Sequence, residues 1–306
     1  MRMSDIEGGQ DSRCGFAAII GAPNAGKSTL VNQLVGAKVS IVTHKVQTTR
    51  TRVLGIALHG DAQIAFIDTP GIFKPRRRLD RAMVSAAWQG AQDADATVLL
   101  IDAQTGVTEE VDDILKGLQN GGGKVILALN KIDLVKRESL LQLADRLNAT
   151  GLFSDIFMVS ATRADGTDDL IEHLANRMPK SVWLFPEDQL SDMPQMLLAA
   201  EVTREKLFLN VHQELPYALT VETESYDVRK DGSVRIEQVI YVERESQRAI
   251  ILGKNGSKVK TVGQLAREEL QEMFETKVHL FLYVKVRDRW QDDPERYRIW
   301  NLDFKA

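Results

Sequence analysis

Residues Gly21–Thr29 read GAPNAGKST and satisfy the pattern G-x-x-x-x-G-K-[ST], with Gly21, Gly26, Lys27 and Ser28 in the four fixed places. The glycines let the backbone wrap closely around a polyphosphate, so that several N–H groups point at its oxygens. Lys27 can then reach the β- and γ-phosphates, and the hydroxyl of Ser28 can ligate Mg²⁺. The apolar run GFAAII precedes the motif. The segment STLVNQLVG begins at its last two residues and continues beyond it with helical periodicity, which gives the strand–loop–helix setting that the motif requires. The remaining loop residues are expected to line the nucleotide as well: Ala22, Pro23, Asn24, Ala25 and Thr29.

Length and composition predict two domains of ordinary size in a globular chain. The chain has 306 residues, of which 43% are hydrophobic and 27% are charged. The net charge of −4 excludes a polycation, so any contact with nucleic acid needs a local basic surface. Cys14 is the single cysteine, which excludes an internal disulfide and favours a reducing cytoplasm. No apolar run is long enough to predict a membrane span, and residues 1–12 are expected to form a disordered lead-in.

The first half alternates between apolar runs and amphipathic segments. Continuous runs such as VLLI and VILAL are typical of strands covered on both faces. This alternation predicts an α/β fold with a mostly parallel six-stranded sheet, in which the hairpin around Gly60 and Asp61 adds one antiparallel edge strand. The expected strands are Phe16–Ile20, Val53–Leu58, Gln63–Ile67, Thr97–Ile101, Lys124–Leu129 and Ile156–Val159. The expected helices between them include Leu79–Gln89, Glu109–Gln119 and Leu140–Leu147.

Three short motifs follow strands that end on the same edge of this sheet as the phosphate loop. DTPG (Asp68, Thr69, Pro70, Gly71) offers a carboxylate for Mg²⁺ and a free N–H at Gly71 that can sense a γ-phosphate. NKID (Asn130, Lys131, Ile132, Asp133) places a carboxylate that can accept hydrogen bonds from N1–H and N2–H₂ of guanine. SAT, which begins with Ser160 and Ala161, can offer a backbone N–H to the guanine O6. An ATP-using P-loop enzyme is the alternative, and Asp133 argues against it because adenine lacks this pair of donors.

With these four motifs in this order, the first half resembles a translation-factor-class GTPase domain. The resemblance implies that THKVQTTR (Thr43–Arg50) is the first switch loop, in which a threonine closes on Mg²⁺ when the γ-phosphate is present. Thr49 is the expected ligand, together with Ser28 and Asp68, and Thr48 is the alternative. Lys27, Thr49 and Asn24 are the expected catalytic residues.

Ile72 follows DTPG at the position where Ras-like GTPases carry the glutamine that orients the attacking water. An apolar side chain cannot orient water, so another group must do so. Some GTPases with this replacement recruit K⁺ through an asparagine of the phosphate loop, and Asn24 occupies the matching place. A role of Asn24 in stabilising the loop is the alternative. The arginines after Ile72, Arg76–Arg78, are interpreted either as a partner contact or as a solvated face.

The second half is predicted to be an α+β domain. Its pattern is helix, two strands joined through Asp231-Gly232, helix, GKNG (Gly253–Gly256), a long helix and a last strand. This order resembles the type II KH fold, in which a GxxG loop approaches the sugar-phosphate backbone of about four nucleotides. The residues expected to bind RNA lie in and around this loop: Arg248, Ile250, Ile251, Leu252, Gly253, Lys254, Asn255, Gly256, Lys258 and Lys260. The expected boundaries are 13–180 for the GTPase domain, 181–196 for the linker and 197–306 for the KH domain with its tail, whose Trp290, Tyr297 and Trp300 are expected to dock on it.

Both halves together resemble the Era family of bacterial GTPases, through KVQTTR, PEDQ, ILGKNGSKVKTVGQLAREEL and KVHLFLYVKV. The resemblance implies a monomeric GTPase that binds GTP and GDP, and that binds the 3′ end of 16S ribosomal RNA during assembly of the small (30S) ribosomal subunit. It also implies a cytoplasmic location with peripheral association with the inner membrane. The alternative function is a GTP-dependent signalling or membrane-recruitment protein whose second domain binds protein or lipid.

Overall fold

The computed structural model describes residues 11–43, 45, 48–121, 125–211 and 215–306 of the chain. They form two compact units. The first unit holds the described residues up to Asp192 together with Tyr297–Ala306, and the second is Met193–Arg296. Residues 1–10 of the expected lead-in lie outside the described residues, whereas Ser12 is buried and its hydroxyl donates to the carbonyl of Ser181 at 2.9 Å.

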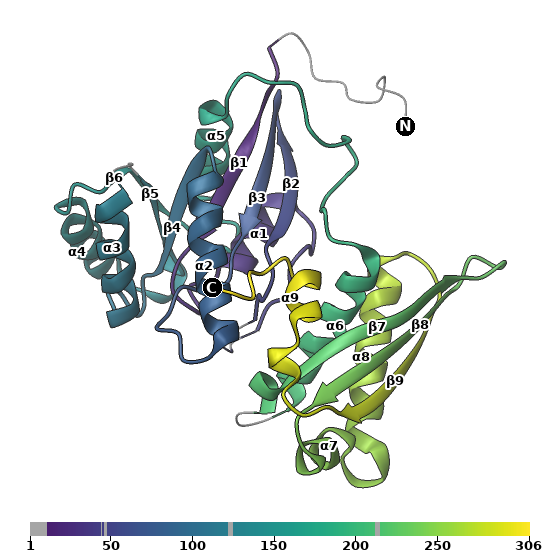
Figure 1. Cartoon of the computed structure of the whole chain (residues 1–306). Coiled ribbons are helices and arrows are strands. Elements are labelled where there is room, and N and C mark those ends of the chain that lie inside the picture. Colours follow the sequence, from purple (N-terminus) through teal and green to yellow (C-terminus); the bar gives the residue numbers. More distant parts are fainter. Residues whose placement is uncertain (1–10, 44, 46–47, 122–124, 212–214) are drawn as a thin grey trace. The chain divides into compact units, whose positions relative to one another are not determined.

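The first unit is built on a six-stranded sheet with the strand order β2-β3-β1-β4-β5-β6 (Figure 1). Only β2 pairs antiparallel, with β3, so the expected mostly parallel sheet with one antiparallel edge strand is confirmed. The strands are β1 (Arg13–Ile20), β2 (Val53–His59), β3 (Ala62–Asp68), β4 (Ala96–Asp102), β5 (Val125–Asn130) and β6 (Phe153–Met158). The parallel strands therefore end at one edge, where the four sequence motifs follow them.

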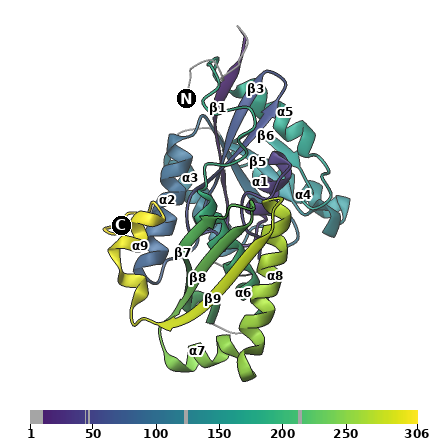
Figure 2. The same ribbon diagram turned by 90° about the vertical axis from the view of Figure 1, so that its right-hand side faces the viewer.

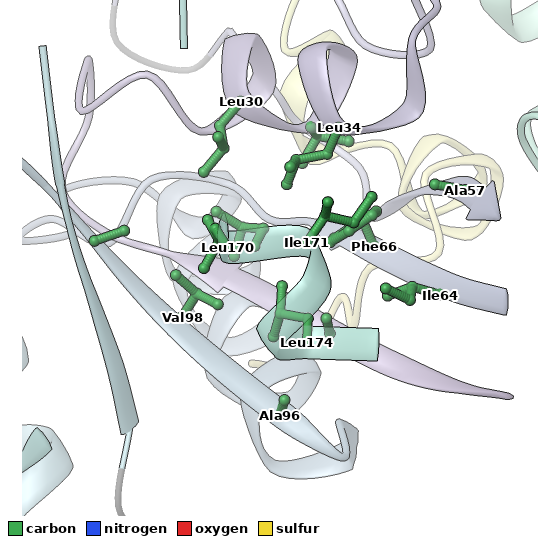
Figure 3. Packing of buried hydrophobic residues seen from close by; sticks show 14 of the residues in the cluster. Leu30, Leu34, Ala57, Ile64, Phe66, Ala96, Val98, Leu170, Ile171 and Leu174 are labelled. Atoms are coloured by element: carbon green, nitrogen blue, oxygen red, sulfur yellow. The ribbon is translucent and has the colours of Figure 1, made fainter. Parts of the chain in front are cut away.

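Helices cover both faces of this sheet. One core joins the sheet to α1 (Lys27–Val35) and α5 (Thr167–Arg177), and the second joins it to α2 (Arg78–Asp93), α3 (Glu109–Gly121) and α4 (Arg137–Asn148). Figure 3 shows Leu30 and Leu34 of α1 and Leu170 of α5 against Phe66 and Val98 of the sheet. In β4 the side chains of residues 98–101 alternate between the two cores, which explains why this part of the strand is a continuous apolar run.

The second unit packs its helices on one face of a three-stranded sheet (Figure 2). The strands β7 (Leu219–Val228) and β8 (Val234–Val242) pair antiparallel, and β9 (Val278–Val286) pairs parallel with β8. The helices are α6 (Gln195–Asn210), α7 (Glu245–Leu252) and α8 (Ser257–Met273), and the expected KH order is confirmed. A short helix, α9 (Pro294–Ile299), follows β9.

The segment expected as a linker differs from that expectation at both ends. Residues up to Asp192 belong to the first unit, where Gln63 in β3 binds the backbone of Leu184 and Phe185. Helix α6 begins at Gln195, inside the expected linker, directly after Pro194, whose fixed φ suits a helix start. The prolines of this segment thus mark a helix start as well as a chain connection.

The C-terminal tail also differs from the expectation. Trp290 packs in the second unit as expected, fully buried, and its indole N–H donates to the carbonyl of Ala218 at 3.1 Å. Tyr297 and Trp300 instead belong to the first unit, in which the hydroxyl of Thr51 donates to the carbonyl of Trp300 at 2.8 Å. Sequence alone does not distinguish the two, because a buried aromatic residue satisfies either surface. Among the described residues, no helix is long and apolar enough to cross a membrane.

Candidate functional sites

The phosphate loop lies between β1 and α1 and needs glycine at two positions. Gly21 and Gly26 have φ values of 155° and 97°. A Cβ on Gly21 would lie 2.4 Å from the carbonyl oxygen of Leu100, and one on Gly26 would lie 2.3 Å from the side-chain nitrogen of Asn130. The close approach of neighbouring strands thus requires these glycines independently of any ligand.

Lys27 is the first residue of α1 and is buried in the loop that it serves. Its ammonium group donates to the carbonyls of Gly21 at 3.2 Å and Ala22 at 3.0 Å. Burial lowers the pKa of Lys27 to about 8, an effect that the nearby Asp68 carboxylate partly offsets. A polyphosphate in the loop would supply the negative charge that this buried cation lacks.

Asp68, at the end of β3, brings together the residues predicted to hold Mg²⁺. Its Oδ2 accepts hydrogen bonds from the hydroxyls of Ser28 at 2.7 Å, Thr49 at 3.2 Å and Ser40 at 2.5 Å. The hydroxyls of Ser28 and Thr49 are themselves 2.9 Å apart. Three separate segments of the first unit therefore place oxygen atoms at one point.

This oxygen cluster fits a divalent cation. Asp68 is fully buried, its Oδ1 has no hydrogen-bond partner, and burial raises its pKa. A cation would satisfy the unpartnered oxygen and stabilise the ionised carboxylate. Within the described residues no group of three or more acidic, histidine or cysteine side chains could hold a metal, so phosphate oxygens would complete the shell, as Mg²⁺ prefers.

The geometry distinguishes the two threonines considered for the first switch loop. The hydroxyl of Thr48 lies 2.6 Å from that of Thr43 and donates to the carbonyl of Lys45 at 2.6 Å, so it points into its own loop. The hydroxyl of Thr49 points to Asp68 and Ser28. Thr49 therefore has the position expected of a metal ligand. His44, Val46 and Gln47 of this loop lie outside the described residues.

NKID lies at the end of β5 and holds the phosphate loop from the other side. The side-chain amide of Asn130 donates to the carbonyl of Ala25 at 2.8 Å. The ammonium of Lys131 donates to the carbonyl of Asn24 at 2.8 Å and pairs with Asp102, at the end of β4, at 2.6 Å. These bonds tie the base-binding motif to the phosphate-binding motif.

Asp133 faces SAT, the motif after β6. The hydroxyl of Ser160 donates to its Oδ1 at 2.7 Å, and this bond lowers the pKa of Asp133. The guanidinium of Arg163 lies 3.4 Å from Oδ2. In this motif, which is expected to offer a backbone N–H to the base, the N–H of Ala161 donates to the side-chain oxygen of Asn130 at 3.1 Å. A carboxylate kept ionised suits the acceptance of two hydrogen bonds from guanine.

These motifs line one cavity of about 580 Å³, a size usual for a small-molecule site. The predicted residues along its wall include Pro23, Asn24, Gly26, Lys27, Ser28, Thr29, Thr49, Gly71, Asn130, Lys131, Asp133 and Ala161. Thr162 of the SAT motif also lines it, and sequence reasoning missed Gln104. It also missed Ser40 and Asp102, since no motif contains them and only the fold brings them to Asp68 and Lys131.

Asn24 lies within the phosphate loop, and Ile72 is bonded to that loop through its backbone. Ile72 is buried, and its backbone N–H donates to the carbonyl of Gly21 at 3.0 Å. Asn24 is exposed and has a φ of 62°, a left-handed conformation that asparagine tolerates better than most residues. That conformation supports the loop-stabilising role of Asn24 and leaves its amide available to a ligand.

The GKNG loop joins α7 to α8 in the second unit. Gly253 has φ 70° and ψ 179°, and a Cβ there would lie 2.8 Å from the side chain of Lys258 and 3.1 Å from its backbone nitrogen. Lys254, Lys258 and Lys260 are exposed around the loop, whereas Arg248 pairs with Glu245 at 3.3 Å. The glycine backbone and these ammonium groups form a surface on which phosphates can bind.

The three apolar residues expected to line the nucleic-acid groove behave differently. Ile250 is 45% exposed and Leu252 is partly exposed, so both can contact a ligand. Ile251 is 1% exposed and packs in the core with Val262, so its expected place in the groove is wrong. On a helix, adjacent residues point in different directions, and Ile251 is the one that faces the sheet.

The comparisons with known proteins cover both units. A family model described as 50S ribosome-binding GTPase matches residues 16–131, and one described as KH domain matches residues 214–291. GTPase Era of Sinorhizobium medicae is 60% identical over 293 residues, which are 96% of this chain and 94% of that protein. This chain belongs to the Era family of GTPases. GTPase Era of Agrobacterium fabrum is 61% identical over 293 residues, or 96% of this chain and 92% of that protein.

Two solved Era structures share the whole architecture. One is Era in complex with MgGDPNP and nucleotides 1506–1542 of 16S ribosomal RNA, with a TM-score of 0.90, 36% identity and coverage of 94% of this chain and 98% of that chain. The other is a point variant of Aquifex aeolicus Era bound to GDP·AlF₄⁻, with a TM-score of 0.89 and the same identity and coverage. The expected Era-type combination of a GTPase domain and a KH domain is confirmed.

Proposed function

We propose that this Era-family GTPase is a Mg²⁺-dependent switch whose KH domain binds the 3′ end of 16S ribosomal RNA in the assembly of the small ribosomal subunit. One observation carries the proposal. The Era structure similar over 94% of this chain holds both MgGDPNP and that RNA segment, and this chain has both the Ser28–Thr49–Asp68 cluster and the GKNG loop.

The hydrolytic site uses residues of the first unit. Ser28, Thr49 and Asp68 would hold Mg²⁺, which when bound supplies charge neutralisation between the β- and γ-phosphates. Lys27 and the loop N–H groups stabilise negative charge on the transferred phosphoryl group. Ile72 has no polar atom to orient water, so backbone groups or a partner must position it and intrinsic turnover is slow.

Asn24 is proposed to add K⁺ to this site. Its exposed amide at the mouth of the phosphate loop offers an oxygen, and a monovalent cation there would place positive charge where other GTPases use an arginine. Mg²⁺ binding and K⁺ binding are separate proposals, because no residue of the Asp68 cluster depends on Asn24.

The nucleic-acid site uses the GKNG loop. Gly253, Asn255 and Gly256 let the backbone approach the RNA, Ile250 and Leu252 contact bases, and the ammonium groups of Lys254, Lys258 and Lys260 contact phosphates. Arg248, which is exposed on α7 before the loop, is proposed to contact a phosphate as well. A GxxG loop of this kind contacts about four single-stranded nucleotides, which suits the 3′ end of an RNA.

The two activities are proposed to be coupled. GTP would order the first switch loop through Thr49 and the second through Gly71, and RNA access would follow the nucleotide state. We propose that the protein is a monomer that acts in the cytoplasm, and that its association with the inner membrane is peripheral, as the family resemblance implies.

Binding of an RNA oligonucleotide with the 3′-terminal sequence of 16S ribosomal RNA tests this function. The full chain should bind it more tightly with a GTP analogue than with GDP, and the affinity should fall steeply with salt. The double variant Lys254→Gln/Lys258→Gln should lose at least about tenfold in affinity, because two phosphate contacts are removed. The matched control, Lys136→Gln/Arg137→Gln in the first unit, should bind as the wild type does. Equal affinity for a scrambled sequence would overturn the proposal.

The alternative is a signalling or membrane-recruitment protein whose second domain binds protein or lipid. Such a protein would bind anionic vesicles in the presence of a GTP analogue and would have no affinity for the 3′-terminal oligonucleotide. The paired measurement of vesicle and RNA binding therefore separates the two functions.

A further inference from the structure

Ser40 binds the carboxylate at the centre of the proposed Mg²⁺ site, although it belongs to none of the nucleotide-binding motifs. Its hydroxyl donates at 2.5 Å to Oδ2 of Asp68, the oxygen that also accepts the hydroxyls of Ser28 and Thr49. Ser28 and Thr49 line the nucleotide cavity, whereas Ser40 is 3% exposed and does not line it. The hydroxyl of Ser40 is therefore placed to act on a bound cation through Asp68.

The backbone of Ser40 is held by Asn32, a residue of α1. The Oδ1 of Asn32 accepts the N–H groups of Val39 at 3.0 Å and of Ser40 at 2.9 Å, and its Nδ2 donates to the carbonyl of Ser40 at 2.8 Å. Residues 36–43 belong to no helix or strand, so this side chain supplies the hydrogen bonds that a neighbouring strand would otherwise give. Asn32 thus fixes Ser40 to the helix that begins with Lys27 and Ser28.

The residues on either side of Ser40 are anchored in the first unit. Val39 is buried in the same core as Val31 of α1, and Ile41 is buried as well. Gly55 of β2 leaves room for Val39, because a Cβ at this glycine would lie 3.0 Å from the Val39 side chain. Packing and the bonds to Asn32 therefore hold this segment at two levels, through its side chains and through its backbone.

The hydroxyl of Ser40 limits the orientations that the Asp68 carboxylate can adopt. Ser40 and Ser28 come from different segments and bind the same oxygen, Oδ2, so rotation of the carboxylate would break both hydrogen bonds. The other oxygen, Oδ1, is buried and has no hydrogen-bond partner. It is thereby left for a cation or for a water molecule bound to that cation. Groups that orient a metal ligand in this way commonly set the affinity of the metal.

We propose that Ser40 is a positioning residue for Mg²⁺, whose hydroxyl, placed by Asn32, orients the Asp68 carboxylate toward the cation. This role rests on the Mg²⁺ site proposed above. It differs from the role of Thr49, which lies in the first switch loop and is expected to close on Mg²⁺ only with GTP. Because Ser40 is tied to α1, it should orient Asp68 in the GDP complex as well as in the GTP complex.

The test measures how strongly Mg²⁺ slows the release of a fluorescent GDP analogue from the full chain. Ser40→Ala should need about tenfold or more free Mg²⁺ for half-maximal slowing, because the carboxylate loses the donor that orients it. Ser12→Ala is the matched control, since it removes another buried hydroxyl of the first unit, which donates to the carbonyl of Ser181. The control should need the same Mg²⁺ concentration as the wild type. Urea unfolding checks that each variant is folded.

A second variant tests whether Asn32 acts through Ser40. Asn32→Ala should raise the half-maximal Mg²⁺ concentration at least about threefold, because Ser40 is then free to move away from Asp68. The double variant Asn32→Ala/Ser40→Ala should stay within about twofold of Ser40→Ala, since both changes remove the same contact. Effects that multiply in the double variant would overturn the proposed dependence on Asn32.

The measurement separates a positioning role from a merely structural one. If Ser40→Ala lowers the free energy of unfolding but leaves the Mg²⁺ dependence of GDP release at the wild-type value, the proposal is overturned. It is also overturned if Ser12→Ala shifts the Mg²⁺ dependence as much as Ser40→Ala does. Release of GDP from the wild type that does not respond to Mg²⁺ would instead refute the Mg²⁺ site proposed above.

Discussion

The hydroxyl of Ser28 lies 2.7 Å from Oδ2 of Asp68, while Oδ1 of the same carboxylate is buried without a partner. Ser28 comes from the start of α1 and Asp68 from the end of β3, so the pair spans the phosphate loop and the second switch. The fold has therefore assembled a cation site whose ligands lie forty residues apart in the sequence.

The first prediction concerns this pair. Asp68→Asn should lower GTP hydrolysis about a hundredfold or more, because the amide removes the charge that holds the cation against the phosphates. Adding Mg²⁺ should raise the nucleotide affinity of the wild type and should have little effect on the nucleotide affinity of the variant. Asp113→Asn, an exposed aspartate on α3, is the control. Hydrolysis by Asp68→Asn at the wild-type rate would exclude the proposed site.

The pKa of Lys27 predicts proton uptake when nucleotide binds. A lysine in an unfolded chain keeps its proton to about pH 10.4, whereas burial lowers the pKa of Lys27 to about 8. The nucleotide-free protein should therefore gain stability as the pH rises from 8 towards 10, because the unfolded state binds more protons there.

Phosphates in the loop restore the charge of Lys27, so binding of GDP at pH 8 should take up about half a proton, and at pH 6.5 almost none. Calorimetric titration in two buffers of different ionisation enthalpy measures this uptake. Equal binding heats in both buffers at pH 8 would contradict the burial argument.

Asp133 should set the choice of base. Asp133→Asn should weaken GTP binding at least about a hundredfold, because two hydrogen bonds to a charged acceptor are lost, and should favour xanthosine triphosphate, whose base offers an oxygen in place of the amino group. Asp169→Asn on α5 serves as the control. Competition between the two nucleotides checks this, and unchanged GTP affinity would rule out the base contact.

A substitution of Asn24 can distinguish a role in K⁺ binding from a role in stabilising the loop conformation. Its φ of 62° is easy for glycine, so Asn24→Gly keeps the loop conformation and removes only the amide. If K⁺ binds here, the wild type should hydrolyse GTP faster in K⁺ than in Na⁺, and Asn24→Gly should lose that difference. Equal wild-type rates in the two salts would refute the K⁺ proposal.

The two glycines of the GKNG loop should differ in their tolerance of alanine. Gly256→Ala should cost about 1 kcal/mol, the strain of a left-handed residue with open space around it. Gly253→Ala should cost roughly 2 kcal/mol or more, because its φ and ψ suit only glycine and the new Cβ would meet Lys258. The free energy of unfolding of each variant can be measured by urea unfolding, with hydrogen exchange of the β8 amides as the probe. Equal losses of unfolding free energy in the two variants would contradict this prediction.

Sequence reasoning predicted the sites best where backbone conformation and residue identity depend on each other. Gly21, Gly26 and Lys27 could be located because only these residue types satisfy a phosphate loop, and Asp68 and Asp133 because each follows a buried strand. The apolar runs likewise predicted a sheet covered on both faces. These features are local, so a short stretch of sequence contains all the information.

Tertiary structure alone decided which distant groups meet. Ser40 reaches Asp68, Asp102 reaches Lys131, and Trp300 joins the first unit through Thr51. Ile251 lies in the core although its neighbour Ile250 is exposed. A single hydroxyl, carboxylate or aromatic ring has many partners available at similar free energy, and the packing of whole strands and helices selects among them. The sequence by itself therefore determined the nucleotide-binding and KH folds, and only the tertiary structure decided the contacts that complete their sites.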